Sequence, residues 1–96
     1  MDYTIKFIFN AKLYPATILL DFKETPCFVY AYLKDPGLIS RFGTDIDIKT
    51  DCYKVLPGKI LDPGLLELKA AIFNVVKNTE QFQMERARSG QLYRLN

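Results

Sequence analysis

Apolar and polar positions alternate along the first part of the chain. Residues 3–9 alternate with a period of two, and residues 16–23 repeat this pattern. A period of two places successive side chains on opposite faces of a β-strand. Because Asn10-Ala11-Lys12 between the two runs supplies a turn, the pattern predicts a β-hairpin. Pro15 cannot donate to a ladder of hydrogen bonds, so we expect it at a strand start or on an edge.

The third predicted strand, Cys27–Leu33, differs from the first two because neither of its faces is polar. One face would carry Cys27, Val29, Ala31 and Leu33, and the other Phe28, Tyr30 and Tyr32. A strand with two apolar faces is typical of the middle of a sheet that is covered on both sides. Alternatively, it carries an exposed aromatic surface that binds another molecule. The pattern leaves both interpretations open.

The middle of the chain predicts a short helix followed by another strand. Asp35-Pro36 supplies an N-cap and a first-turn proline, and Gly43 supplies a terminating glycine. Residues 44–49 then alternate as a fourth strand. Residues 52–56 either extend that strand or return beside it, so the sheet has four or five strands.

A second Asp-Pro pair, Asp62-Pro63, starts the main predicted helix. Placed at 100° per residue, one face of this helix carries Leu65, Leu68, Ile72, Val75 and Val76. No helix breaker follows Thr79 before Ser89-Gly90, so the helix can run on to Arg88. It would then span roughly 40 Å and project beyond a small sheet or meet another subunit. Residues 91–96 would form a docked strand or a loose tail.

These elements predict a single α+β domain over residues 1–96. We expect an antiparallel sheet of four to five strands with one long C-terminal helix packed across one face, and residues 79–96 as an extension of that helix with its tail. The predicted core on the sheet side consists of Ile5, Phe7, Ile18, Leu20, Val29, Ile46 and Ile48. Since one helix cannot cover both faces, the face with the aromatic residues of the third strand would be an interaction surface.

Composition narrows the class of protein. Apolar residues make up 49% and charged residues 25% of 96 residues, which argues against intrinsic disorder. There is neither an apolar run long enough to span a membrane nor a secretory signal at the N-terminus, so we expect a cytoplasmic protein without membrane contact. Cys27 and Cys52 would then be buried thiols, with a disulfide between adjacent strands as the alternative.

The net charge and its distribution give little information about binding partners. The formal net charge is +2, and residues 49–96 carry eight Lys/Arg against five Asp/Glu. A protein that binds duplex DNA usually shows a stronger and more clustered excess of positive charge.

Most of the usual catalytic residues and motifs are missing. The chain has no His, only Ser40 and Ser89 as serines, and no glycine-rich phosphate loop or zinc motif. Asp45, Asp47 and Asp51 alternate along one strand and could hold a metal, although a solvated strand face explains them as well. Lys69 could be a desolvated base or a lysine whose ammonium reaches solvent. We therefore predict no enzyme, cofactor or metal.

The main functional hypothesis is a small, non-enzymatic protein–protein interaction or dimerisation module. Its partner would be a second copy or another protein. The surface would combine the aromatic strand face with a second apolar line on the long helix: Phe28, Tyr30, Tyr32, Leu66, Phe73 and Met84.

Two alternatives remain. The same aromatic face could stack the bases of single-stranded nucleic acid, with Arg86, Arg88 and Arg94 contacting phosphates, although the flanking motif of RNA-binding sheets is absent. The chain could instead bind a small molecule or a metal around Asp45, Asp47 and Lys69.

Overall fold

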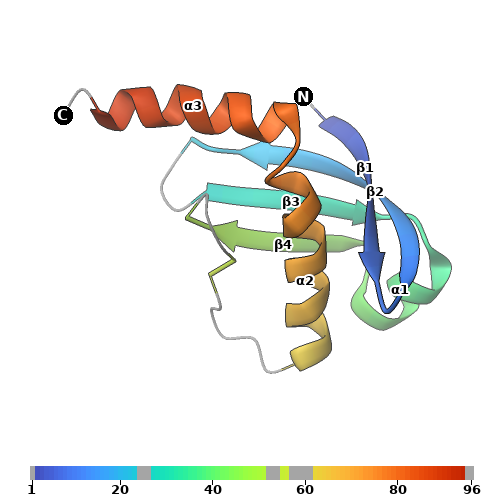
Figure 1. Cartoon of the computed structure of the whole chain (residues 1–96). Coiled ribbons are helices and arrows are strands. Elements are labelled where there is room, and N and C mark those ends of the chain that lie inside the picture. The colour runs from blue at the N-terminus through green and yellow to red at the C-terminus, as the bar shows by residue number, and fades with distance from the viewer. Residues whose placement is uncertain (1, 24–26, 52–54, 57–61, 95–96) are drawn as a thin grey trace.

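The computed structural model describes residues 2–23, 27–51, 55–56 and 62–94, and these residues form a four-stranded antiparallel sheet with three helices (Figure 1). The strands follow one another across the sheet in the order β1-β2-β3-β4. The elements in chain order are β1 (Asp2–Phe9), β2 (Lys12–Asp21), β3 (Cys27–Leu33), α1 (Pro36–Phe42), β4 (Asp45–Thr50), α2 (Pro63–Val76) and α3 (Glu80–Arg94). The predicted α+β class and antiparallel sheet are confirmed. None of the described helices is long and apolar enough to cross a membrane.

The predicted hairpin is formed by β1 and β2 around a two-residue turn. Phe9 pairs with Lys12, and the turn residues Asn10 and Ala11 have φ values of 52° and 62°. Asn tolerates this left-handed conformation better than Ala does. Pro15 lies beyond the β2–β3 pairing, which starts at Ala16, so its missing N–H removes no bond between those strands.

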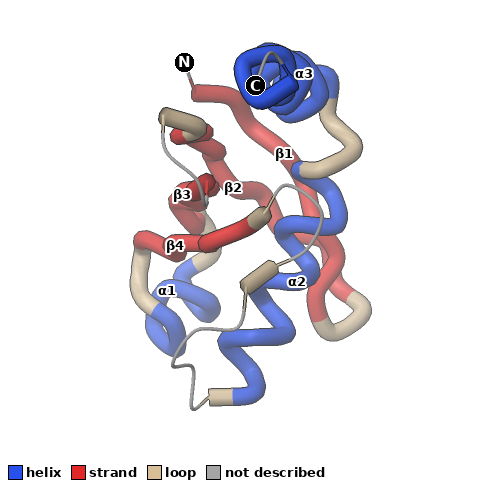
Figure 2. Tube along the Cα trace, turned by 90° about the vertical axis from the view of Figure 1, so that its left-hand side faces the viewer, coloured by secondary structure: helices blue, strands red, loops and turns tan. Residues whose placement is uncertain are grey.

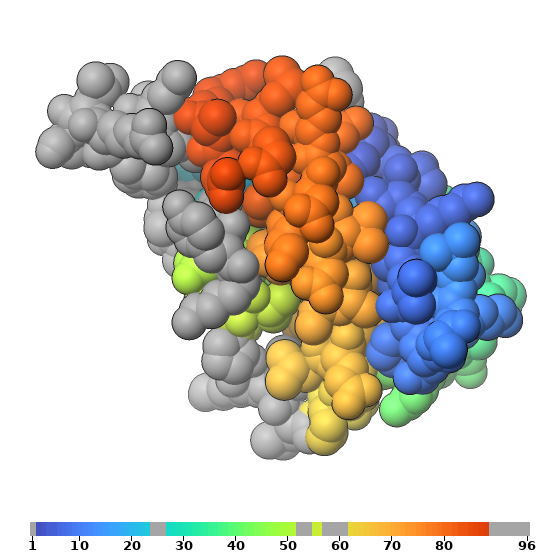
Figure 3. Space-filling model, viewed as in Figure 1, coloured from blue at the N-terminus to red at the C-terminus, as the bar shows by residue number. Residues whose placement is uncertain are grey.

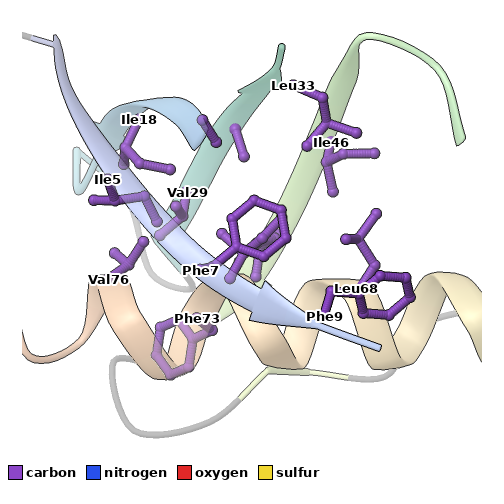
Figure 4. Close-up of a cluster of buried hydrophobic side chains, with 14 of the residues drawn as sticks. Ile5, Phe7, Phe9, Ile18, Val29, Leu33, Ile46, Leu68, Phe73 and Val76 are labelled. Atoms are coloured by element: carbon purple, nitrogen blue, oxygen red, sulfur yellow. The ribbon is translucent and has the colours of Figure 1, made fainter. Parts of the chain in front are cut away.

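One face of the sheet is covered by α2 and holds the core (Figure 4). Side chains from all four strands meet side chains of α2 there, and six of the seven predicted core residues are buried: Ile5, Phe7, Ile18, Val29, Ile46 and Ile48. The seventh, Leu20, is only partly buried and packs against the others. From the helix side, the fully buried residues include Leu68, Ile72 and Val76, as the helical period predicts.

Both Asp-Pro pairs start helices. The Asp35 carboxylate accepts a hydrogen bond from the Leu38 N–H at 3.1 Å, and the Asp62 carboxylate accepts one from the Gly64 N–H at 2.9 Å. These bonds satisfy N–H groups that have no partner within the helix. Gly43 ends α1 at a φ of 90°, where a residue with a Cβ would be strained.

The prediction of one long C-terminal helix is wrong, because the chain turns at residues 77–79 and continues as α3. Thr79 is the main cause. Its hydroxyl donates to the Val76 carbonyl at 2.7 Å, at the end of α2, and accepts from the Phe82 N–H at 3.3 Å, at the start of α3. The same hydroxyl thus bonds to the end of α2 and caps the start of α3. The change of direction inserts Phe82 into the core, where it is fully buried.

The C-terminal limit of the helix also differs from the prediction. α3 runs through Ser89-Gly90 to Arg94, so residues 91–94 are neither a docked strand nor a loose tail. A glycine inside a helix costs about 1 kcal/mol relative to Ala, which is too little to end a helix by itself. Residues 95–96 lie outside the described residues.

A fifth strand is not formed within the described residues. Val55 makes an isolated antiparallel bridge with Thr50, and the Leu56 N–H donates to the Lys49 carbonyl at 2.8 Å. The chain therefore returns beside β4, which was one of the two predicted alternatives. Residues 52–54, including Cys52, lie outside the described residues.

Candidate interaction surface

The face of the sheet opposite α2 carries the aromatic residues of β3. Figure 2 shows no described helix along this face. Their side chains alternate with the buried ones along the strand, and each is partly exposed. The strand register places residues of β2 and β4 on either side of this aromatic stripe. We call the resulting surface the open face; it consists of Thr17, Leu19, Asp21, Phe28, Tyr30, Tyr32, Asp45, Asp47 and Lys49.

The aromatic stripe is flat and regular. The rings of Phe28 and Tyr30 are nearly parallel, with an interplanar angle of 7° and centroids 5.9 Å apart. Residues two apart on a strand point to the same side, so Tyr32 continues the row. Because β3 is hydrogen-bonded to a strand on each side, its backbone holds these rings in a fixed arrangement.

Acidic residues flank the stripe. On β4, Asp47 lies directly opposite Tyr30 and Asp45 lies opposite Tyr32. Across β2, Asp21 lies opposite Phe28, whose other neighbour on β4 is Lys49. Three Asp against one Lys leave two negative charges on this face, in a chain whose formal net charge is +2.

Two of these carboxylates act on Tyr30. Partial desolvation raises the pKa of its phenol above 10.0, and the nearby charges of Asp21 and Asp47 raise it further. The negative charge of the phenolate would be repelled by both carboxylates.

The other predicted surface residues do not form one apolar line. Phe73 is 3% exposed and belongs to the core, where its ring meets the Phe82 ring edge-on at 5.6 Å. Leu66 on α2 and Met84 on α3 are exposed, but the turn at residues 77–79 separates the two helices. The predicted apolar line required residues 62–88 to form one continuous helix, but α2 and α3 are separate helices.

The arginines proposed for phosphate contact lie on α3. Arg88 forms an ion pair with Glu85 at 3.3 Å, and Arg86 donates to the Gln83 side chain at 2.8 Å. Arg88 also lines a hollow of about 490 Å³ together with Tyr3 and Leu20, whose side chains belong to the α2 side of the sheet. The structure therefore does not bring Arg88 to the aromatic stripe. Arg94 lies in the last turn of α3, and its side chain is outside the described residues.

The proposed metal or small-molecule residues are also dispersed. Asp45 and Asp47 are exposed on β4, whereas Lys69 lies on α2, on the other side of the sheet. Among the described residues, no group of three or more His, Cys, Asp or Glu is arranged to hold a metal ion.

The sequence pattern did not reveal an exposed apolar pair across the β1–β2 hairpin, next to its turn. Ile8 is 65% and Leu13 is 55% exposed, and both line a shallow groove of about 540 Å³ that also borders α2. Figure 3 shows the β1–β2 hairpin beside α2 in this region. An isoleucine at a polar position of the period-two pattern was the available signal.

No protein-family model, curated protein or solved structure matches this chain. Its function is therefore inferred from its surface chemistry.

Proposed function

We propose that this chain is a small, non-enzymatic protein-interaction module, and that the open face binds another protein chain. The observation that carries the proposal is the aromatic stripe of Phe28, Tyr30 and Tyr32, which lies in the middle of the sheet on the side away from α2. A large aromatic row without a cover among the described helices is the kind of patch that marks a binding surface.

The chemistry of the stripe suits a protein partner. Aromatic residues, Tyr in particular, are enriched at protein interfaces, because they bury about 150–250 Å² each and offer a polar end as well. The stripe is also held by strands on both sides, so little conformational freedom would be lost on binding.

The same surroundings disfavour nucleic acid. Asp45 and Asp47 lie directly opposite the two tyrosines, where a bound strand would bring its phosphates close to carboxylates. Single-strand binders instead surround their stacking aromatics with positive charge. Arg88, which could have supplied it, lies on the other side of the sheet.

We further propose that the module works in the cytoplasm. The chain has only two cysteines, and a low cysteine content suits a reducing compartment. Cellular fractionation of the tagged protein tests this part.

The experiment is site-specific photo-cross-linking in cells that produce the protein. A benzophenone amino acid replaces Tyr32 on the open face in one variant and Glu67, exposed on α2, in the control. We expect a discrete protein adduct from position 32, absent from position 67, which disappears when Tyr30→Lys is added. Identical adducts from both positions, or an adduct to nucleic acid, would overturn the proposal.

A further inference from the structure

We infer that the occupant of the open face is an extended segment of a different protein that carries arginine or lysine side chains at alternate positions. This inference rests on the proposed function and names the chemistry of the partner. It is carried by the placement of carboxylates around an aromatic row.

Charge complementarity selects a basic partner. The open face carries two net negative charges, and the described residues place no Lys or Arg in an ion pair with Asp45 or Asp47. A second copy docked face to face would oppose two such surfaces, so like charges would meet. A partner with cationic side chains meets the opposite sign instead.

Tyr30 is the centre of the expected contact. Asp47 lies directly across from it on β4, and Asp21 lies diagonally on β2, beside the parallel ring of Phe28. Directly opposed Cβ atoms in a sheet are about 5 Å apart and diagonal ones about 7 Å, within reach of one long side chain. A guanidinium over the Tyr30 ring would therefore contact the π face and a carboxylate together.

The chain uses the same chemistry elsewhere. The Lys12 ammonium lies 5.4 Å from the centre of the Tyr14 ring, and the Arg41 guanidinium lies 4.7 Å from that of Phe42. Among the described residues, no cation occupies the corresponding position over the stripe on β3. A partner side chain can supply it.

The spacing of the carboxylates predicts the shape of the segment. Asp45 and Asp47 are two residues apart on β4, so they point to the same side at a separation of about 7 Å. An extended peptide also repeats its side-chain direction every two residues. Two cations in an Arg-x-Arg pattern would match the two carboxylates, with the intervening backbone over the stripe.

The test is fluorescence anisotropy with a labelled peptide, Gly-Arg-Val-Arg-Val-Arg-Gly. The matched control peptide replaces each Arg with citrulline, which keeps the shape and removes the charge. The protein is used as wild type, as Asp45→Asn with Asp47→Asn, and as Glu67→Gln, which removes an exposed acid on α2. We expect at least tenfold weaker binding for the citrulline peptide and for the double variant, and unchanged binding for E67Q.

The outcomes separate this inference from the proposed function. Equal affinity for the two peptides, or wild-type affinity of the double variant, would overturn the basic-partner inference. If a protein adduct still forms from position 32, the proposed function stands with a partner of other chemistry.

Light scattering over a range of concentrations tests the second copy as occupant. If the wild type is a dimer and Tyr30→Lys dissociates it, the occupant of the open face is a second copy and not a basic partner. The chain would still be an interaction module. Tighter binding of labelled single-stranded RNA than of the arginine peptide would overturn both proposals.

Discussion

The two faces of the sheet share the same strands but differ in what they carry, and β3 shows the difference most clearly. Its covered side holds the small residues Val29 and Ala31, which are completely buried, whereas its open side holds the larger Phe28 and Tyr30, which are partly exposed. Both sides are apolar. The covered face of β3 carries no aromatic ring, whereas the open face carries three.

The largest expected effect comes from removing a ring on the covered side. Phe82 is fully buried and meets Phe22 at 5.3 Å and Phe73 at 5.6 Å, edge-on in both cases. Phe82→Ala should lower the free energy of unfolding by about 3 kcal/mol, because it removes these contacts and leaves a cavity. Urea denaturation measures the change.

Met84, two residues further along α3, provides the control. It is 55% exposed, so Met84→Ala should change the stability by less than about 0.5 kcal/mol. Equal effects of the two substitutions would show that α3 is not anchored by its buried ring.

A pair of neighbouring substitutions in β3 compares the two faces directly. Val29→Ala on the covered side should cost about 2 kcal/mol. Phe28→Ala removes a much larger side chain from the open face and should cost less than about 1 kcal/mol, the size of a cross-strand pair. Thermal unfolding of the two variants gives the ranking, and the reverse order would mean that the open face is part of the core.

The hydroxyl of Thr79 lies at the turn between α2 and α3, and removing it is the next substitution to test. It also shares a hydrogen bond of 2.9 Å with the Tyr3 hydroxyl. Thr79→Val preserves the shape but removes the cap and this bond, at a cost of about 1–2 kcal/mol. A double-mutant cycle with Tyr3→Phe measures the shared part, and strict additivity would argue against that hydrogen bond in solution.

The smallest effect is a dependence of stability on alkaline pH. Burial raises the pKa of Tyr3 above 10.0, although the hydrogen bond to Thr79 opposes this shift. The neutral phenol is thus favoured in the folded state, and its contribution is complete below pH 10 and lost as the pH rises past the folded-state pKa. Between pH 9 and 11 the melting temperature of wild type should fall more than that of Y3F. Parallel curves would assign the fall to the other tyrosines.

Most of the sheet could be predicted because its signals are local. The period of two identified the buried faces of β1, β2 and β4, and Asp35 and Asp62 identified two helix starts through capping chemistry that needs only neighbouring residues. The break at Thr79 was missed because a lone Thr in a helical pattern is ambiguous. In the structure, Thr79 also bonds to the hydroxyl of Tyr3, which is 76 residues away in the sequence, and the helix that follows places Phe82 in the core.

The candidate site was predicted only in part, for a similar reason. The apolar stripe on β3 follows from the sequence pattern. That Asp47 lies opposite Tyr30 depends on strand order and register, which residue spacing alone does not specify. The continuous helical line through Phe73 failed because it assumed that α2 and α3 were one helix.

The buried ring of Phe82 in α3 also has a consequence for motion. Among residues 80–88, whose side chains are described, Phe82 is the one that is fully buried. Burying one such ring is worth about 1.5–3 kcal/mol, so on the order of one molecule in a hundred would have α3 detached while the sheet and α2 remain folded. The amide hydrogens of α3 should then exchange with solvent well before those of β2 and β3. α3 would thus detach from the folded sheet and α2 and return to them, and each detachment would expose the rings of Phe22 and Phe73 to water.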